Sequence, residues 1–241
     1  MGLTREIGFD FYGLRVAARS DSAELLDDVR HDFSYFLADA PDPALTLELA
    51  LGPGPRDRLP ALPATLVTPR NLVYRDGDAS YLDYFGEALA VCESHPAKVT
   101  VCADRRDLAH EVAFLTVLSR VGVHLDAVGL HRVHALGVEV GGRAVLLLLP
   151  MGGGKTTLAL HLLGCGGVRL LSEDSPLIDR RGRVHPFPLR IGVRPGGVPE
   201  GVPPQHCRTV ERMEFGPKTL IDVEHFRDRL ARPCPIGAVL L

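Results

Sequence analysis

Apolar and polar positions alternate along the first hundred residues, except in one stretch with helical spacing. Residues 6–18 alternate loosely and Leu45–Leu49 strictly, which is typical of strands with one buried face. Between them, apolar residues recur every three or four positions, which predicts an amphipathic helix over about residues 22–38 with Asp21 as its N-cap. Short apolar segments separated by turns follow from residue 71 to residue 102. This half predicts a small antiparallel sheet beside one helix, that is, an N-terminal α+β domain of residues 1–103.

The second half predicts a different order of elements, which we assign to a domain of residues 104–241. A helix is expected from Asp104 to about residue 121, then two strands, residues 131–140 and 143–149, joined by a tight turn at Gly141-Gly142. A helix to about residue 163, a strand over 168–171 and a hairpin with its turn at 179–182 follow. The chain as a whole is therefore expected to be α/β. It ends in an apolar run, which indicates either a fragment of a longer protein or a terminal strand held in a sheet.

Composition narrows the class of protein. The 241 residues are 46% hydrophobic and 24% charged, as in a globular chain of one large domain or two small ones. A formal net charge of −3 favours no nucleic-acid partner, and no apolar run of about 18 residues predicts a membrane span. The five cysteines are scattered and never in C-x-x-C spacing, which favours reduced core thiols over a metal cluster. We expect a cytoplasmic protein with no membrane attachment.

The strongest chemical signal lies between the second of these strands and the helix after it. Four leucines end at Leu149, three glycines follow at Gly152, Gly153 and Gly154, and Lys155-Thr156-Thr157 opens the helix. Glycines let backbone N–H groups approach a phosphate, and a helix N-terminus adds a favourable dipole. A lysine here reaches the β- and γ-phosphates, while the hydroxyl of Thr156 suits Mg²⁺. We interpret the stretch as a nucleotide site, the alternative being a glycine-rich helix start without a ligand. The standard spacing has its first glycine where this chain has Leu149.

An acidic pair, Glu173-Asp174, follows the next apolar strand. Ligands bind at the carboxyl ends of strands in sheets of this kind, so the pair is expected near the glycine turn. One carboxylate would hold Mg²⁺ and the other would accept the proton of an attacking hydroxyl. The alternative is a solvated acidic turn.

Four other residues remain open at this stage. His134, expected in the strand over 131–140, is by itself most simply a core or surface histidine. Arg190, Arg194 and Lys218 lie in or beside short apolar runs, where they either contact phosphate or are solvated.

Residues 130–178 resemble the C-terminal catalytic domain of HPr kinase/phosphorylase. The shared order is a histidine-bearing strand, a glycine turn, a strand into a P-loop, a short helix, and a strand ending in an acidic pair close to the P-loop. The resemblance implies a P-loop domain with a mixed sheet. It also implies that Lys155 contacts phosphate and that Thr156 and Asp174 hold Mg²⁺, while Glu173 is the base and His134 supports the acidic pair. The chain departs from the family pattern at Leu149, Ala135 and Glu173, which replace glycine, glycine and aspartate.

The expected function is ATP-dependent, Mg²⁺-assisted phosphoryl transfer to a hydroxyl, with serine of a peptide or small protein as the acceptor. The sequence is most similar to HPr-kinase-related proteins of bacterial peptide-modification gene neighbourhoods. No HPr-binding segment is recognisable after the acidic pair. Two alternatives stay open: a nucleotide-binding regulatory or adaptor module with weak ATPase activity, and a small-molecule or carboxykinase-like enzyme. Assembly as a homo-oligomer is also left open.

Overall fold

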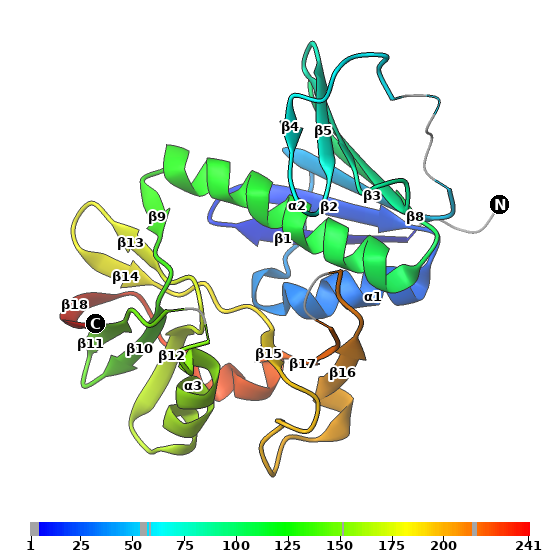
Figure 1. Cartoon of the computed structure of the whole chain (residues 1–241). Helices are drawn as coiled ribbons and strands as arrows, with labels where there is room; N and C mark the ends of the chain where they lie inside the picture. Colours follow the sequence, from blue (N-terminus) through cyan, green and yellow to red (C-terminus); the bar gives the residue numbers. More distant parts are fainter. Residues whose placement is uncertain (1–4, 54–56, 58, 151, 214–215) are drawn as a thin grey trace. The chain divides into compact units, whose positions relative to one another are not determined.

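The computed structural model describes residues 5–53, 57, 59–150, 152–213 and 216–241 (Figure 1). Its contacts divide the chain into two compact units. Met1–Val121 and Glu211–Pro217 form the first, and Gly122–Val210 and Lys218–Leu241 form the second. This division differs from the boundary expected at residue 104, because helix α2 (Arg106–Ala127) belongs to the first unit as far as Val121. The mixed α/β class expected from the sequence is confirmed.

The described part of the first unit contains one sheet of eight strands in the order β1-β2-β3-β8-β7-β6-β5-β4. Their bounds are β1 Arg5–Phe11, β2 Leu14–Ser20, β3 Leu45–Leu51, β4 Leu66–Val67, β5 Leu72–Asp76, β6 Ala79–Asp83, β7 Ala88–Ser94 and β8 Ala97–Ala103. The prediction of an antiparallel sheet is wrong at one strand, because β3 pairs in parallel with both β2 and β8. Parallel pairing of β2 with β3 requires a crossover, which the intervening helix supplies.

That helix, α1 (Ala23–Asp32), is shorter than the sequence predicted. Its N-cap is Ser22 rather than Asp21, and the Ser22 hydroxyl accepts a hydrogen bond of 3.3 Å from the backbone N–H of Leu25. The helix ends because Phe33 leaves the helical conformation at φ −118°. A separate 3₁₀ turn, η1 (Ser34–Phe36), follows, and residues 37–38 of the predicted helix are not helical.

Helix α2 contacts α1 through an ion pair and through a buried histidine–aspartate hydrogen bond. Arg106 donates two hydrogen bonds, of 2.7 and 2.8 Å, to the carboxylate of Asp28. Further along, His110 lies 2.6 Å from Asp32, and both side chains are almost completely buried. By length and hydropathy α2 could cross a membrane, but 56% of its most apolar window is buried inside the fold. These contacts identify it as a core helix of the first unit.

The second unit, as far as it is described, contains a seven-stranded sheet and a three-stranded one. The larger has the order β12-β10-β11-β18-β14-β13-β9, and the smaller β15-β17-β16. Their bounds are β9 Leu130–Arg132, β10 Leu136–Val140, β11 Arg143–Leu147, β12 Val168–Ser172, β13 Leu177–Asp179, β14 Arg183–His185, β15 Ile191–Val193, β16 Cys207–Val210, β17 Lys218–Ile221 and β18 Cys234–Leu240. The larger sheet is mixed, because β11 and β18 are parallel and its other pairs are antiparallel.

One helix, α3 (Lys155–Gly164), covers part of this sheet, and its position fixes the candidate site. Ala159 and Leu163 pack with Leu136 of β10 and Leu170 of β12 in one buried cluster. The 3₁₀ turns η3 (Pro204–His206) and η4 (Val223–Arg229) complete the unit, with Phe226 of η4 in the same cluster. The start of α3 is thereby held near the ends of β11 and β12.

Two local predictions are confirmed in this unit. Gly141 and Gly142 join β10 to β11 with φ values of 58° and 80°, the positive pair that a two-residue hairpin requires. The hairpin with its turn at residues 179–182 is β13–β14. The expectation of core thiols fails at Cys165, which is exposed after α3, although Cys92, Cys102 and Cys234 are buried.

Candidate functional site

The glycine turn after β11 has the backbone that its sequence predicts. Gly152 and Gly154 have φ values of 78° and 86°, which side chains rarely adopt. A Cβ added at Gly153 would lie 3.0 Å from the carbonyl oxygen of Pro150, so this position also favours glycine. Met151, in the same stretch, is outside the described residues. Gly154 is the N-cap of α3, and without a side-chain cap the first N–H groups of the helix stay available to an anion.

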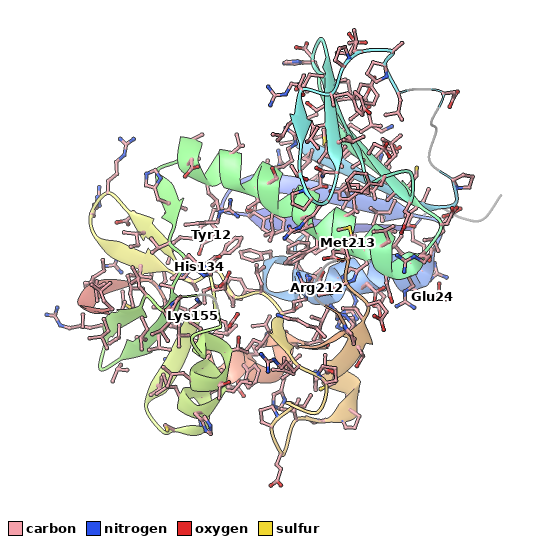
Figure 2. All side chains as sticks on the ribbon, in the orientation of Figure 1. Tyr12, Glu24, His134, Lys155, Arg212 and Met213 are labelled. Carbon is pink, nitrogen blue, oxygen red and sulfur yellow. The ribbon has the colours of Figure 1, made fainter. Side chains whose placement is uncertain are left out.

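Lys155 turns back over this loop and is 8% exposed. Its ammonium donates hydrogen bonds of 2.6 Å to the carbonyl of Leu149 and 3.4 Å to that of Pro150. It also lies 3.1 Å from Nε2 of His134; both residues are labelled in Figure 2. The lysine is therefore positioned by the loop itself, and Leu149 contributes a backbone carbonyl where the standard motif has a glycine.

Thr156, the next residue of α3, contacts the acidic pair. Its hydroxyl donates a short hydrogen bond to Oε1 of Glu173, which follows the end of β12. Burial raises the pKa of Glu173, and the neighbouring charge of Asp174 acts in the same direction. The Thr156 hydrogen bond and the positive charges of Lys218 and Lys155 oppose this shift. Glu173 is thus a carboxylate that takes up a proton more readily than an ordinary glutamate.

His134 lies in the connection between β9 and β10, not in a strand as predicted. Two backbone hydrogen bonds hold that connection against the acidic turn: Val133 N–H donates to the carbonyl of Pro176 at 3.0 Å, and Ala135 N–H to that of Asp174 at 3.2 Å. Nδ1 of His134 consequently lies 3.1 Å from a carboxylate oxygen of Asp174. A neutral His134 with its proton on Nδ1 fits both this contact and the Lys155 contact, since Nε2 is then free to accept from the ammonium.

Ser172, which was not among the predicted site residues, stabilises the acidic turn through its hydroxyl. Its buried hydroxyl donates to the carbonyl of Phe187 at 2.8 Å and accepts from the N–H of Ser175 at 3.0 Å. These bonds fix the backbone on both sides of Glu173-Asp174. A serine at the end of an apolar strand, just before two acids, was the available signal.

Lys218 also reaches this region. It begins β17, its side chain passes over Gly192, and its charge acts on Glu173. The chain has three lysines, and the positive charges of two of them, Lys155 and Lys218, lower the pKa of Glu173. Arg190 and Arg194 stand on either side of β15, and no described contact joins Arg194 to the acidic pair.

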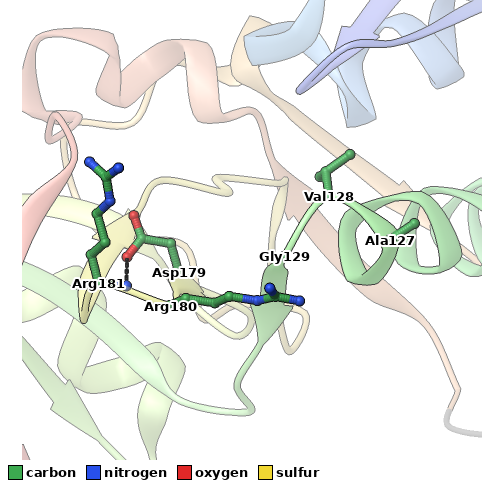
Figure 3. Close-up of a pocket in the computed structure, with 6 residues that line it drawn as sticks. All are labelled: Ala127, Val128, Gly129, Asp179, Arg180 and Arg181. Carbon is green, nitrogen blue, oxygen red and sulfur yellow. Dashed lines mark hydrogen bonds between the residues drawn. The ribbon is translucent and has the colours of Figure 1, made fainter.

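Neither a ready-made metal cluster nor a hollow coincides with this site in the part of the chain that the structure describes. Among the described residues, no group of three or more His, Cys, Asp or Glu side chains is arranged to hold a metal ion. A hollow of about 270 Å³ in the second unit is lined by residues 127–129 and 179–181 and shares no residue with the site (Figure 3). Asp179 in this hollow accepts from the Arg181 N–H at 2.8 Å, and its hydrogen bond with His185 lowers its pKa to about 2.

The structure therefore brings Lys155, Thr156, Glu173, Asp174 and His134 into one chain of contacts. Comparison with protein-family models and with curated protein sequences gave no match.

Proposed function

We propose that the second unit is a kinase of HPr-kinase-like type that transfers phosphate from ATP, with Mg²⁺, to a serine hydroxyl of a peptide or small protein. The observation that carries the proposal is the contact of the first turn of α3 with the acidic pair. Thr156 is hydrogen-bonded to Glu173, seventeen residues later in the chain. A lysine and hydroxyl after a glycine turn, facing two carboxylates, provide the groups that phosphoryl transfer needs.

In this proposal Gly152, Gly153, Gly154 and Thr157 form the phosphate cradle together with Lys155. Phosphate binding would require the Lys155 ammonium to exchange the carbonyls of Leu149 and Pro150 for phosphate oxygens. The exchange replaces neutral acceptors by charged ones, and charge-assisted hydrogen bonds are about twice as strong as neutral ones.

Mg²⁺ and proton transfer are assigned to the acidic pair and its neighbours. Mg²⁺ beside nucleotide phosphates typically takes only one or two carboxylates from the protein, and Thr156 and Asp174 would supply its ligands here. Glu173 would accept the hydroxyl proton as the acceptor oxygen bonds to the γ-phosphorus and the bond to ADP breaks. Because its pKa is raised, Glu173 is a stronger base than an ordinary glutamate. His134 would orient Asp174 through their 3.1 Å contact.

The Thr156–Glu173 hydrogen bond supports a second division of roles, in which Glu173 serves the metal and Asp174 the proton. Glu173→Gln and Asp174→Asn separate the two. The substitution that removes the metal ligand raises the Mg²⁺ concentration needed for half-maximal rate. The substitution that removes the base lowers kcat at saturating Mg²⁺ and changes its pH profile.

The activity is tested by incubating the protein with γ-labelled ATP, Mg²⁺ and a set of serine-containing peptides. We expect label on a serine with the parent protein and none with Lys155→Ala. The matched control is Lys98→Ala, since Lys98 pairs with Glu48 in the first unit. ATP binding with no labelled peptide or small-molecule product would contradict the kinase proposal.

An adaptor or regulatory module with weak ATPase activity is the alternative that one contact favours. The ammonium of Lys155 is hydrogen-bonded to its own loop, and Leu149 replaces the first glycine of the motif. Such a module would release phosphate from ATP equally with and without a peptide. It would also bind a partner only with ATP present.

A further inference from the structure

The first unit contains the larger of the two cavities described, of about 630 Å³, and it is independent of the proposed kinase site. It lies between α2 and one face of the sheet formed by β5, β6 and β7, elements that Figure 1 labels or colours in cyan and green. Clefts of roughly 300–1,000 Å³ are the usual size for small-molecule ligands. All of its lining residues fall within the first unit.

Its walls follow directly from strand and helix periodicity. Val73 and Arg75 alternate along β5 and face the cavity, and their partners across the strand pair are Leu82 and Ser80 of β6. Side chains two apart on paired strands share one face of a sheet. Opposite them, α2 contributes residues 115, 116, 119 and 120, which share one helix face. Apolar and polar groups therefore line the same space.

One end of the cavity is closed by a turn that its own hydrogen bonds hold rigid. The hydroxyl of Thr68 accepts from the N–H groups of Arg70 and Asn71 at 3.1 and 3.0 Å and donates to the Asn71 side chain at 2.8 Å. Tyr84, beside the turn, is 5% exposed, and burial raises its pKa. The cavity is thus largely preformed, which reduces the entropy cost of binding.

All charged side chains that line the cavity are positive. Arg70, Arg75 and Arg120 line the cavity, and none of its described lining residues is acidic. Within the described part of the chain, the guanidinium groups of Arg75 and Arg120 have no ion pair or hydrogen bond. Glu111, earlier on α2, is already engaged, since it accepts from the N–H of Met213 at 2.8 Å and lies 3.5 Å from Arg212.

We propose that this cavity binds an organic anion of small-molecule size, with a carboxylate or phosphate held by Arg75 and Arg120 and an apolar body against Val73, Leu82 and Leu115. Guanidinium groups bind such anions through paired charge-assisted hydrogen bonds. The proposal concerns a site separate from Lys155 and holds whether or not the second unit is a kinase.

The test uses the full chain and two fluorescent probes with the same apolar body. One is 8-anilinonaphthalene-1-sulfonate, and the other is its uncharged counterpart N-phenyl-1-naphthylamine. We expect the double variant Arg75→Gln/Arg120→Gln to raise the Kd of the sulfonate probe by about tenfold or more. The loss of one hydrogen bond to a charged group corresponds to at least that change. The uncharged probe should bind both proteins equally. Arg143→Gln, an exposed arginine of the second unit, is the matched control and should change neither affinity.

A second variant tests the cavity without removing charge. Ser119 is exposed on the α2 face that lines it, and Ser119→Trp would fill the space while keeping every arginine. Both probes should then bind more weakly, with unchanged circular dichroism. The proposal is overturned if the sulfonate probe binds the double arginine variant and Ser119→Trp as tightly as the parent. It is equally overturned if excess ATP displaces the probe from the parent but not from Lys155→Ala.

Discussion

Gly154→Ala isolates the backbone conformation on which the proposed phosphate cradle depends. Gly154 has φ 86° and ψ 14°, and a Cβ there would meet no heavy atom within 4 Å. The cost of alanine is therefore conformational rather than steric. A left-handed conformation costs an L-residue about 1–2 kcal/mol. For a chain of this size that is a fall in melting temperature of about 2–8 °C.

Gly164→Ala is the matched control at the other end of the same helix. A Cβ at Gly164 also meets open space, but its φ is not in the positive range. Alanine there should leave stability unchanged or raise it by about 0.4–1 kcal/mol, because it restricts the unfolded chain. For stability, the comparison therefore tests the sign of φ at a glycine with open space around its Cβ position.

The assay is thermal unfolding followed by circular dichroism, together with a calorimetric titration with ATP and Mg²⁺. We expect Gly154→Ala to lower the melting temperature and to lower the affinity for ATP at least tenfold. Relaxation of the strained residue would turn the first N–H groups of α3 away from the phosphate. Gly164→Ala should bind ATP like the parent. The reasoning is refuted if Gly154→Ala matches Gly164→Ala in both stability and affinity.

Three further predictions follow from single contacts. Asp32→Ala removes the 2.6 Å hydrogen-bond partner of the buried His110 ring and should lower the free energy of unfolding in urea by about 1–3 kcal/mol, whereas equal stability would show that the pair is dispensable. Ser172→Ala removes two hydrogen bonds of a buried hydroxyl and should lower the free energy of unfolding by about 1–3 kcal/mol. In steady-state kinetics it should lower the kcat of phosphate transfer more than it changes the KM for ATP. The raised pKa of Glu173 means that its carboxylate opposes folding above pH 4.5, so Glu173→Gln should raise the melting temperature at pH 8 but not at pH 4. A melting-temperature difference that does not change between these two pH values would contradict the burial of that charge.

Local sequence patterns predicted the elements that form the site. The apolar strand, the three glycines and the helix from Lys155 are where the pattern placed them, and Glu173-Asp174 follows β12 as expected. These features depend on residues close together in the chain. The glycine hairpin at residues 141–142 could be predicted for the same reason.

Contacts between residues far apart in the chain could not be predicted from the sequence. His134 reaches both Lys155 and Asp174 only because backbone bonds from Val133 and Ala135 hold its loop against the acidic turn. The charge of Lys218, in a separate three-stranded sheet, acts on the pKa of Glu173. Periodicity shows that a segment is a strand but not which strand it pairs with. The parallel partners of β3 were missed for that reason.

The proposed reaction is transfer of phosphate to a serine by the first turn of α3 and the acidic pair together. It is tested most directly by mass spectrometry of serine-containing peptides after incubation with ATP and Mg²⁺, using the parent, Lys155→Ala and Asp174→Ala. We expect one added phosphate on a serine with the parent and none with either variant, at unchanged circular dichroism. Phosphorylated peptide at the parent's rate with Lys155→Ala would contradict it.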